Sequence, residues 1–106
     1  MRFNYEVIEE VKLSKLNENY TRLPTDEAVQ AIYQAYNDGN VIMFERNSVY
    51  KTCVYITGVE HNKEEGFHFV KIDENNFPEE IIGGVYDLIE MMDKEYVDYF
   101  WILEVE

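Results

Sequence analysis

Cysteine is almost missing from this sequence of 106 residues, and long apolar runs are missing altogether. A single cysteine, Cys53, excludes a disulfide framework and a zinc site built from cysteines. No apolar stretch approaches the ~20 residues that a membrane-spanning helix needs. The N-terminal segment MRFNYEVIEEV lacks the apolar core of a secretion signal. We therefore expect a cytoplasmic protein that has no membrane partner.

Basic residues are also scarce, because 9 Lys and Arg stand against 22 Asp and Glu, giving a net charge of −13. The imbalance lies in the second half of the chain: residues 1–53 carry 8 acids and 6 bases, whereas residues 54–106 carry 14 acids and 3 bases. Such a field repels nucleic acid and anionic membranes and attracts basic partners. We expect no direct binding to nucleic acid. A surface tuned only for solubility is the plainer alternative.

Apolar and aromatic residues are plentiful, at 46% and 15% of the chain. These fractions exceed those of disordered chains, so the sequence folds, and its length has room for a single domain over residues 1–106. The spacing of the apolar residues predicts the secondary structure. In order, the predicted elements are a strand over residues 3–13, a loop over 14–23, a helix from Thr25 to Gly39, strands over 41–45, 49–59 and 67–72, a helix within 78–96, and a strand over 97–106.

Local signals fix the helix ends to different degrees. Thr25 can cap the first helix, and Gly39 suits the left-handed residue that ends it. The second helix has a glycine pair, Gly83-Gly84, near its start, and two starts stay open: one close to Pro78 and one close to Val85. The resulting order is β-α-β-β-β-α-β. We predict an α+β fold, with a mostly antiparallel sheet and two helices packed on one of its faces.

Catalytic patterns are weak in this sequence. Cys53 with His61 or His68 could be read as a nucleophile and base, but it sits in an alternating strand where a small thiol packs well. The segment 60–68 gathers two histidines and three carboxylates, yet its spacing matches no zinc motif. We predict no catalytic residue, no metal and no cofactor, and keep a metal-binding regulator built on His61 and His68 as an alternative.

Acidic residues on the second predicted helix form the candidate site. The apolar side of this helix stands opposite five acids, which is the pattern of an amphipathic helix: Glu79, Glu80, Asp87, Glu90 and Asp93. The predicted partner-binding set is Glu79, Glu80, Asp87, Glu90, Asp93, Asp73, Glu74 and Asp98. The helix acids alone are too sparse to match the roughly 12 charges of a duplex as long as this helix. With Glu60, Glu64 and Glu65 the set counts eleven acids, if folding brings them to one side. Aromatic residues between them could anchor a protein interface, namely Tyr86, Tyr96, Tyr99 and Trp101.

By class alone, a short, acidic chain with few cysteines resembles phage-encoded inhibitors of host defence nucleases, such as anti-CRISPR and anti-restriction proteins, some of which mimic DNA. It is similar in kind to bacterial immunity proteins that cap basic nuclease toxins. Both resemblances rest on size and charge and carry over no residue. The leading hypothesis is an inhibitor that covers the basic, nucleic-acid-binding surface of a partner protein. The alternatives are an immunity protein and a small regulatory or assembly module, including a homodimer paired through the tail strand.

Overall fold

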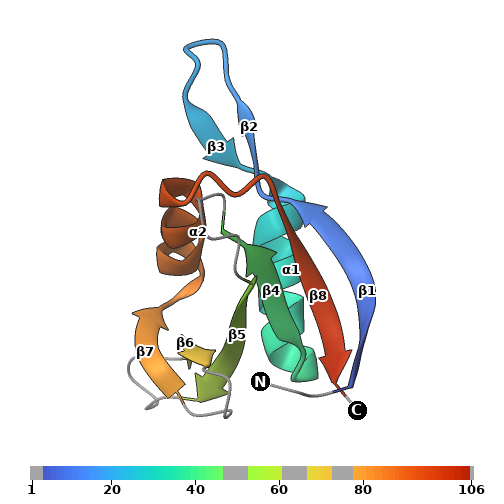
Figure 1. Ribbon diagram of the computed structural model, residues 1–106. Helices are drawn as coiled ribbons and strands as arrows, with labels where there is room; N and C mark the ends of the chain where they lie inside the picture. Colours follow the sequence, from blue (N-terminus) through green and yellow to red (C-terminus); the bar gives the residue numbers. More distant parts are fainter. Residues whose placement is uncertain (1–3, 47–52, 61–66, 73–77, 106) are drawn as a thin grey trace.

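The computed structural model describes residues 4–46, 53–60, 67–72 and 78–105, with the backbone alone at 59–60, 67–68, 72 and 78–82. Figure 1 shows a single sheet with two helices beside it and a small hairpin that projects from one end. The elements are β1 (Tyr5–Lys12), β2 (Ser14–Leu16), β3 (Arg22–Pro24), α1 (Asp26–Asp38), β4 (Val41–Glu45), β5 (Cys53–Glu60), β6 (Phe67–Ile72), β7 (Pro78–Gly83), α2 (Val85–Lys94) and β8 (Tyr99–Val105).

The main sheet has six strands in the order β1-β8-β4-β5-β6-β7, and every neighbouring pair is antiparallel. The last strand, β8, is inserted between β1 and β4, so the N-terminal strand forms one edge of the sheet and the C-terminal strand lies next to it. Helix α1 packs on β1, β4 and β5, helix α2 packs on β6 and β7, and the helices contact each other. The predicted α+β fold, with two helices on one face of an antiparallel sheet, is confirmed.

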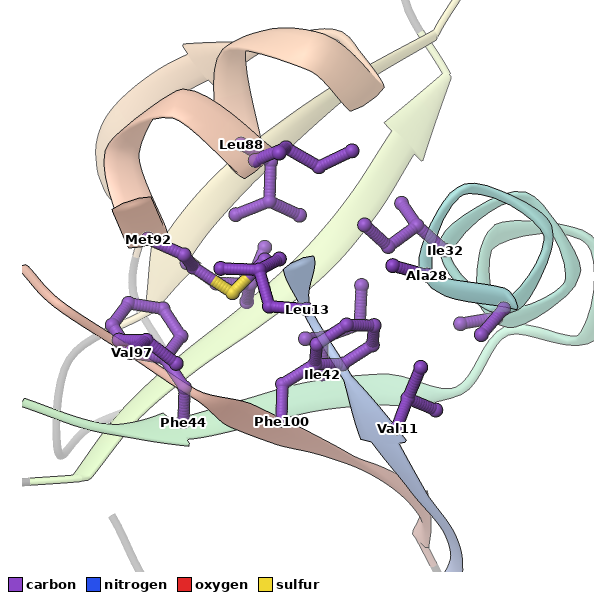
Figure 2. Packing of buried hydrophobic residues seen from close by; sticks show 14 of the residues in the cluster. Val11, Leu13, Ala28, Ile32, Ile42, Phe44, Leu88, Met92, Val97 and Phe100 are labelled. Atoms are coloured by element: carbon purple, nitrogen blue, oxygen red, sulfur yellow. The ribbon is translucent and has the colours of Figure 1, made fainter. Parts of the chain in front are cut away.

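The core lies between the helices and the sheet (Figure 2). Ala28 and Ile32 of α1 face Leu88 and Met92 of α2 across Leu13, and Phe44 and Phe100 of the sheet lie below them in this view. Small residues on α1 let this helix approach the strands closely, while the larger side chains fill the space between the two helices. Neither helix in the described part of the chain has the length and apolar content needed to cross a bilayer.

The ends of α1 agree with the sequence prediction. The Thr25 hydroxyl accepts a hydrogen bond from the backbone N–H of Ala28 at 3.0 Å. At the other end Gly39 has a φ of 70°, and the N–H of Asn40 donates to the carbonyl of Ala35 at 2.9 Å. Both interactions are local, which explains why they could be read from the sequence.

The segment before α2 corrects the sequence interpretation. Of the two helix starts left open, the later one is right, because α2 begins at Val85. Residues 78–83 form strand β7, which pairs with β6 and takes Glu79 and Glu80 off the helix. Gly83, with a φ of 110°, turns the chain from this strand toward the helix. An ideal Cβ there would lie 2.6 Å from an Asp87 carboxylate oxygen, so a side chain would displace this carboxylate in addition to the strain of the positive φ.

The segment predicted as a loop at 14–23 is instead a short hairpin, formed by β2 and β3. Its turn is closed by Asn17, whose side-chain oxygen accepts from the N–H groups of Asn19 and Thr21, both at 2.9 Å. The prediction failed because the hairpin carries little of the apolar alternation typical of strands. It is stabilised by this turn and by hydrogen bonds from Arg22 to Ser14 and Val97.

Strand β1 contains a bulge at Ile8 that the regular alternation of the sequence conceals. Val7 pairs with Leu103, but the next pair joins Glu9 to Ile102, so one extra residue separates the two pairs. A bulge reverses which side of the sheet the following residues face. Val11 therefore points into the helix-covered core, whereas Tyr5 and Val7 lie on the opposite face of the sheet, where both are exposed.

Candidate partner-binding surface

Of the five acids predicted on the second helix, Asp87, Glu90 and Asp93 are on α2, and the first two have local partners. Asp87 accepts a hydrogen bond from the backbone N–H of Gly84 at 3.0 Å and so caps the start of the helix. Glu90 pairs with Lys94, one turn later, at 3.1 Å between Oε1 and Nζ. Both carboxylates stay exposed to solvent, so their charges still contribute to the field around the molecule.

The third helix acid, Asp93, belongs to a network that holds the hairpin. Arg22 of β3 lies 3.4 Å from the Asp93 carboxylate through its Nε and 3.8 Å from Asp98 through Nη2. The same guanidinium donates hydrogen bonds to the Ser14 hydroxyl and to the Val97 carbonyl, each at 2.9 Å. Asp93 is thus partly buried and its first role is structural, while Asp98 remains largely exposed.

The remaining predicted acids lie where the structure describes no side chains. Glu79 and Glu80 lie on β7, where only the backbone is described. Asp73 and Glu74 fall outside the described residues, as do Glu64 and Glu65. The structure therefore brings together Asp93 and Asp98, through Arg22, near the C-terminal end of α2. The common surface of the full predicted set stays a prediction, because the side chains of Glu79, Glu80, Asp73 and Glu74 are not described.

The aromatic residues named from the sequence are more exposed than core residues would be. Tyr86 on α2 and Tyr96 after it are 66% and 69% exposed, and Tyr99 at the start of β8 is 44% exposed. Trp101 is half-buried on the sheet face opposite the helices, and its indole N–H donates to a Glu10 carboxylate oxygen at 3.0 Å. Exposed tyrosines of this kind provide contact area at low cost in side-chain entropy.

Three of these aromatics line one pocket, which we call the aromatic pocket. Tyr96, Tyr99 and Trp101 form part of its wall, and Asp98 lies among them. Val97 lines it too, as do Glu45 and Arg46, which come from the end of β4. The pocket has a volume of about 240 Å³. Sequence reasoning missed Glu45 and Arg46, because only the pairing of β4 with β8 brings them to Trp101.

Tyr96 occupies a backbone position that favours glycine. Its N–H donates to the Asp93 carbonyl at 3.1 Å and the next N–H, of Val97, donates to Met92 at 3.1 Å, which is the Schellman ending of a helix. The residue between these bonds takes a left-handed conformation, and Tyr96 has a φ of 56°. Tyr20, at the tip of the hairpin, has a φ of 59° and is 85% exposed. In the described ranges, these two exposed tyrosines are the non-glycine residues with positive φ.

We expect Tyr96→Gly to stabilise the fold. A left-handed residue with a Cβ is strained, and relief of this strain should raise the free energy of unfolding by about 1 kcal/mol. Urea denaturation measures this change in the free energy of unfolding. Tyr86→Gly, on the exposed face of α2, is the control and should destabilise the fold, since glycine inside a helix costs about 1 kcal/mol. Equal destabilisation by both changes would show that the Tyr96 backbone carries no strain.

Two further features are visible only in the structure. A groove of about 440 Å³ between β1 and α1 is lined by Glu9, Asp26 and Glu27, together with Gln30, Ala31 and Gln34. The hairpin displays Leu16, Tyr20 and Leu23 to solvent. The acids of the groove come from distant elements, and only Asp26 and Glu27 had a local signal, as favourable charges at a helix start.

Cys53 has no sign of activation as a nucleophile. Burial raises the pKa of its thiol, and the nearby carboxylate of Glu45 raises it further. A thiol with a raised pKa is protonated at neutral pH and attacks poorly. Groups of three or more His, Cys, Asp or Glu side chains arranged to hold a metal ion do not occur among the described residues. The alternative site at His61 and His68 lies outside the described side chains.

No protein-family model, no curated protein and no solved structure matches this chain.

Proposed function

We propose that this chain is a non-catalytic binding domain that covers a basic surface of a partner protein, normally a surface used for nucleic acid. Such an inhibitor would act by occupying the site that a polyanion otherwise takes. The observation that carries the proposal is the aromatic pocket, in which exposed tyrosines stand beside the carboxylates of Glu45 and Asp98 on a chain of net charge −13. Interface hot spots are enriched in these aromatic residues.

The distribution of ion pairs supports a basic partner. Arg22 is engaged by Asp93 and Asp98, and Lys94 by Glu90, so two of the few cations in the chain are already paired within it. The excess acids must be neutralised by solvent ions or by a partner. Release of those ions and long-range attraction would accelerate association with a cationic surface, while the aromatic residues would supply the desolvated contacts.

The acids predicted on the second helix remain part of this proposal, but their role in it changes. Asp87, Glu90 and Asp98 belong to the C-terminal half of the chain and are exposed, so they would contribute to its negative electrostatic field. Since three acids on α2 are too few to imitate a duplex, the proposal favours charge complementarity with a protein over detailed mimicry of DNA. Glu79, Glu80, Asp73 and Glu74 stay as proposed contributors to the same field.

Competition with duplex DNA tests the proposal. The immobilised chain is incubated with lysate of its source cell, and bound protein is eluted with duplex DNA or with salt. We expect a specific nucleic-acid-binding protein that DNA displaces. The double change Glu45→Lys and Asp98→Lys should reduce retention by at least about tenfold, because it reverses charge beside the aromatic pocket.

A matched control separates local from total charge. Glu104 lies near the other end of β8, and a double change to lysine at Glu104 and Glu6, which pair across β1 and β8, alters the net charge equally. This control should retain the partner at near wild-type level. The proposal is wrong if bound protein is not displaced by DNA, or if both double variants lose retention to the same extent.

A further inference from the structure

The aromatic pocket contains charged groups of both signs, and their arrangement restricts what it can bind. Glu45 and Asp98 supply two carboxylates, and Arg46 supplies one guanidinium. The Nε of Arg46 is buried and has no hydrogen-bond partner within the described part of the chain. A buried donor without an acceptor is costly, and a ligand in the pocket reaches this atom only if Arg46 moves.

The size and walls of the pocket indicate a single side chain as its occupant. A volume of about 240 Å³ is smaller than typical small-molecule sites, which begin at roughly 300 Å³. The faces of Tyr and Trp attract cations, and Trp does so most strongly. An anionic group would meet two carboxylates and the field of a chain with net charge −13. A cation is therefore favoured.

Tyr96 gives a second, independent reason to treat the pocket as a site. Its backbone takes a left-handed conformation that glycine would adopt without strain, yet a large aromatic side chain stands there and remains mostly exposed. Strain of this kind marks positions where a side chain is kept for a purpose other than stability. The Tyr96 side chain, kept in spite of this strain, lines the pocket.

We propose that the aromatic pocket accepts an arginine side chain of the basic partner. The planar guanidinium would stack on the aromatic wall and face the carboxylates of Glu45 and Asp98. Arginine suits this site better than lysine because its flat, weakly hydrated cation stacks on aromatic rings. This inference rests on the proposed function and names the group through which the partner is anchored.

Trp101 makes the test direct, because it is the single tryptophan of the chain and lines the pocket. Its fluorescence is followed while N-acetyl-arginine methylamide is added to the full chain, with N-acetyl-citrulline methylamide as the neutral probe of the same shape. We expect a saturable change with the arginine probe, and binding of the citrulline probe that is weaker by at least about tenfold. Equal responses to the two probes, or no saturable response, would overturn the proposal.

Variants then assign the signal to the pocket. Tyr99→Ala and Glu45→Gln should each weaken binding of the arginine probe by at least about fivefold. Tyr86→Ala, an exposed tyrosine of α2 away from the pocket, should leave it unchanged. Tyr96→Gly is the most informative variant. It should weaken binding of the arginine probe while making the fold more stable, so unfolding cannot explain the loss of binding. Undiminished binding in all three pocket variants would contradict the assignment.

The outcomes also separate this inference from the proposed function. A partner displaced by DNA, together with an arginine probe that does not bind, would leave the function standing and remove the arginine pocket. Saturable binding of the arginine probe without any basic partner would support the pocket and contradict the inhibitor role. A lysine probe that binds more tightly than the arginine probe would overturn the choice of side chain.

Discussion

Gly58→Ala should lower the free energy of unfolding by about 2 kcal/mol and the melting temperature by about 10 °C. Gly58 lies on β5 opposite Phe69 of β6, and the ring of Tyr36 from α1 covers it. An ideal Cβ on Gly58 would overlap the Tyr36 ring at Cδ2 and approach Cγ to 3.3 Å. The ring also meets Phe69 edge-on, with centroids 6.3 Å apart, so it cannot move aside without losing that contact.

A double-mutant cycle with Tyr36→Ala tests this cause. Once the ring is removed, alanine at Gly58 has space, and the second change should cost less than about 0.5 kcal/mol because alanine is at least as favourable as glycine in a strand. Thermal denaturation of the four proteins gives the coupling energy. An equal loss of stability in both backgrounds would show that the cost arises from the backbone at Gly58 and not from Tyr36.

Arg22→Met should also cost about 2 kcal/mol, because it removes the anchor between the hairpin and the body of the domain. The guanidinium bonds the Ser14 hydroxyl and the Val97 carbonyl and faces two carboxylates, Asp93 and Asp98. Methionine preserves much of the stem but leaves the partly buried Asp93 without its cation. Urea denaturation measures the stability. Hydrogen exchange should show faster opening at Leu16 and Leu23 of the hairpin than in α1.

Two controls accompany this prediction. Lys15→Met removes a neighbouring, exposed cation of the hairpin and should change stability by less than about 0.5 kcal/mol. Arg22→Lys should recover less than half of the loss, since one ammonium group cannot reach all the acceptors that the planar guanidinium reaches. If Arg22→Met and Lys15→Met were equally mild, the network around Arg22 would not be an anchor.

Much of the fold could be predicted from the sequence, because the signals that specify it are local. Strands β4 and β6 have the predicted bounds, and the α1 cap at Thr25 and its end at Gly39 have their expected geometry. The segment 78–83 could not be assigned, since Glu79, Glu80 and the isoleucines after them suit a helix as well as a strand. Pairing with β6 decides in favour of a strand, and a short window of sequence contains no information about this pairing.

The candidate surface was predictable only in part, because it too depends on contacts between segments that are distant in the sequence. The acids of α2 and the aromatic residues were visible as residue types, but their partners come from distant segments. Arg22 reaches Asp93 from a hairpin near the other end of the chain, and Glu45 reaches the aromatic pocket because β8 inserts beside β4. Tertiary contacts of this kind decide whether an acid is a structural ion pair or part of an exposed surface.

The association rate constant between this chain and the protein that it retains, measured against salt, tests the central claim most directly. Stopped-flow fluorescence of Trp101 would follow the reaction from about 50 mM to about 500 mM salt, where screening becomes strong. We predict that the association rate falls by at least about tenfold across this range, while the dissociation rate changes much less. An association rate that is indifferent to salt would contradict recognition by a cationic surface.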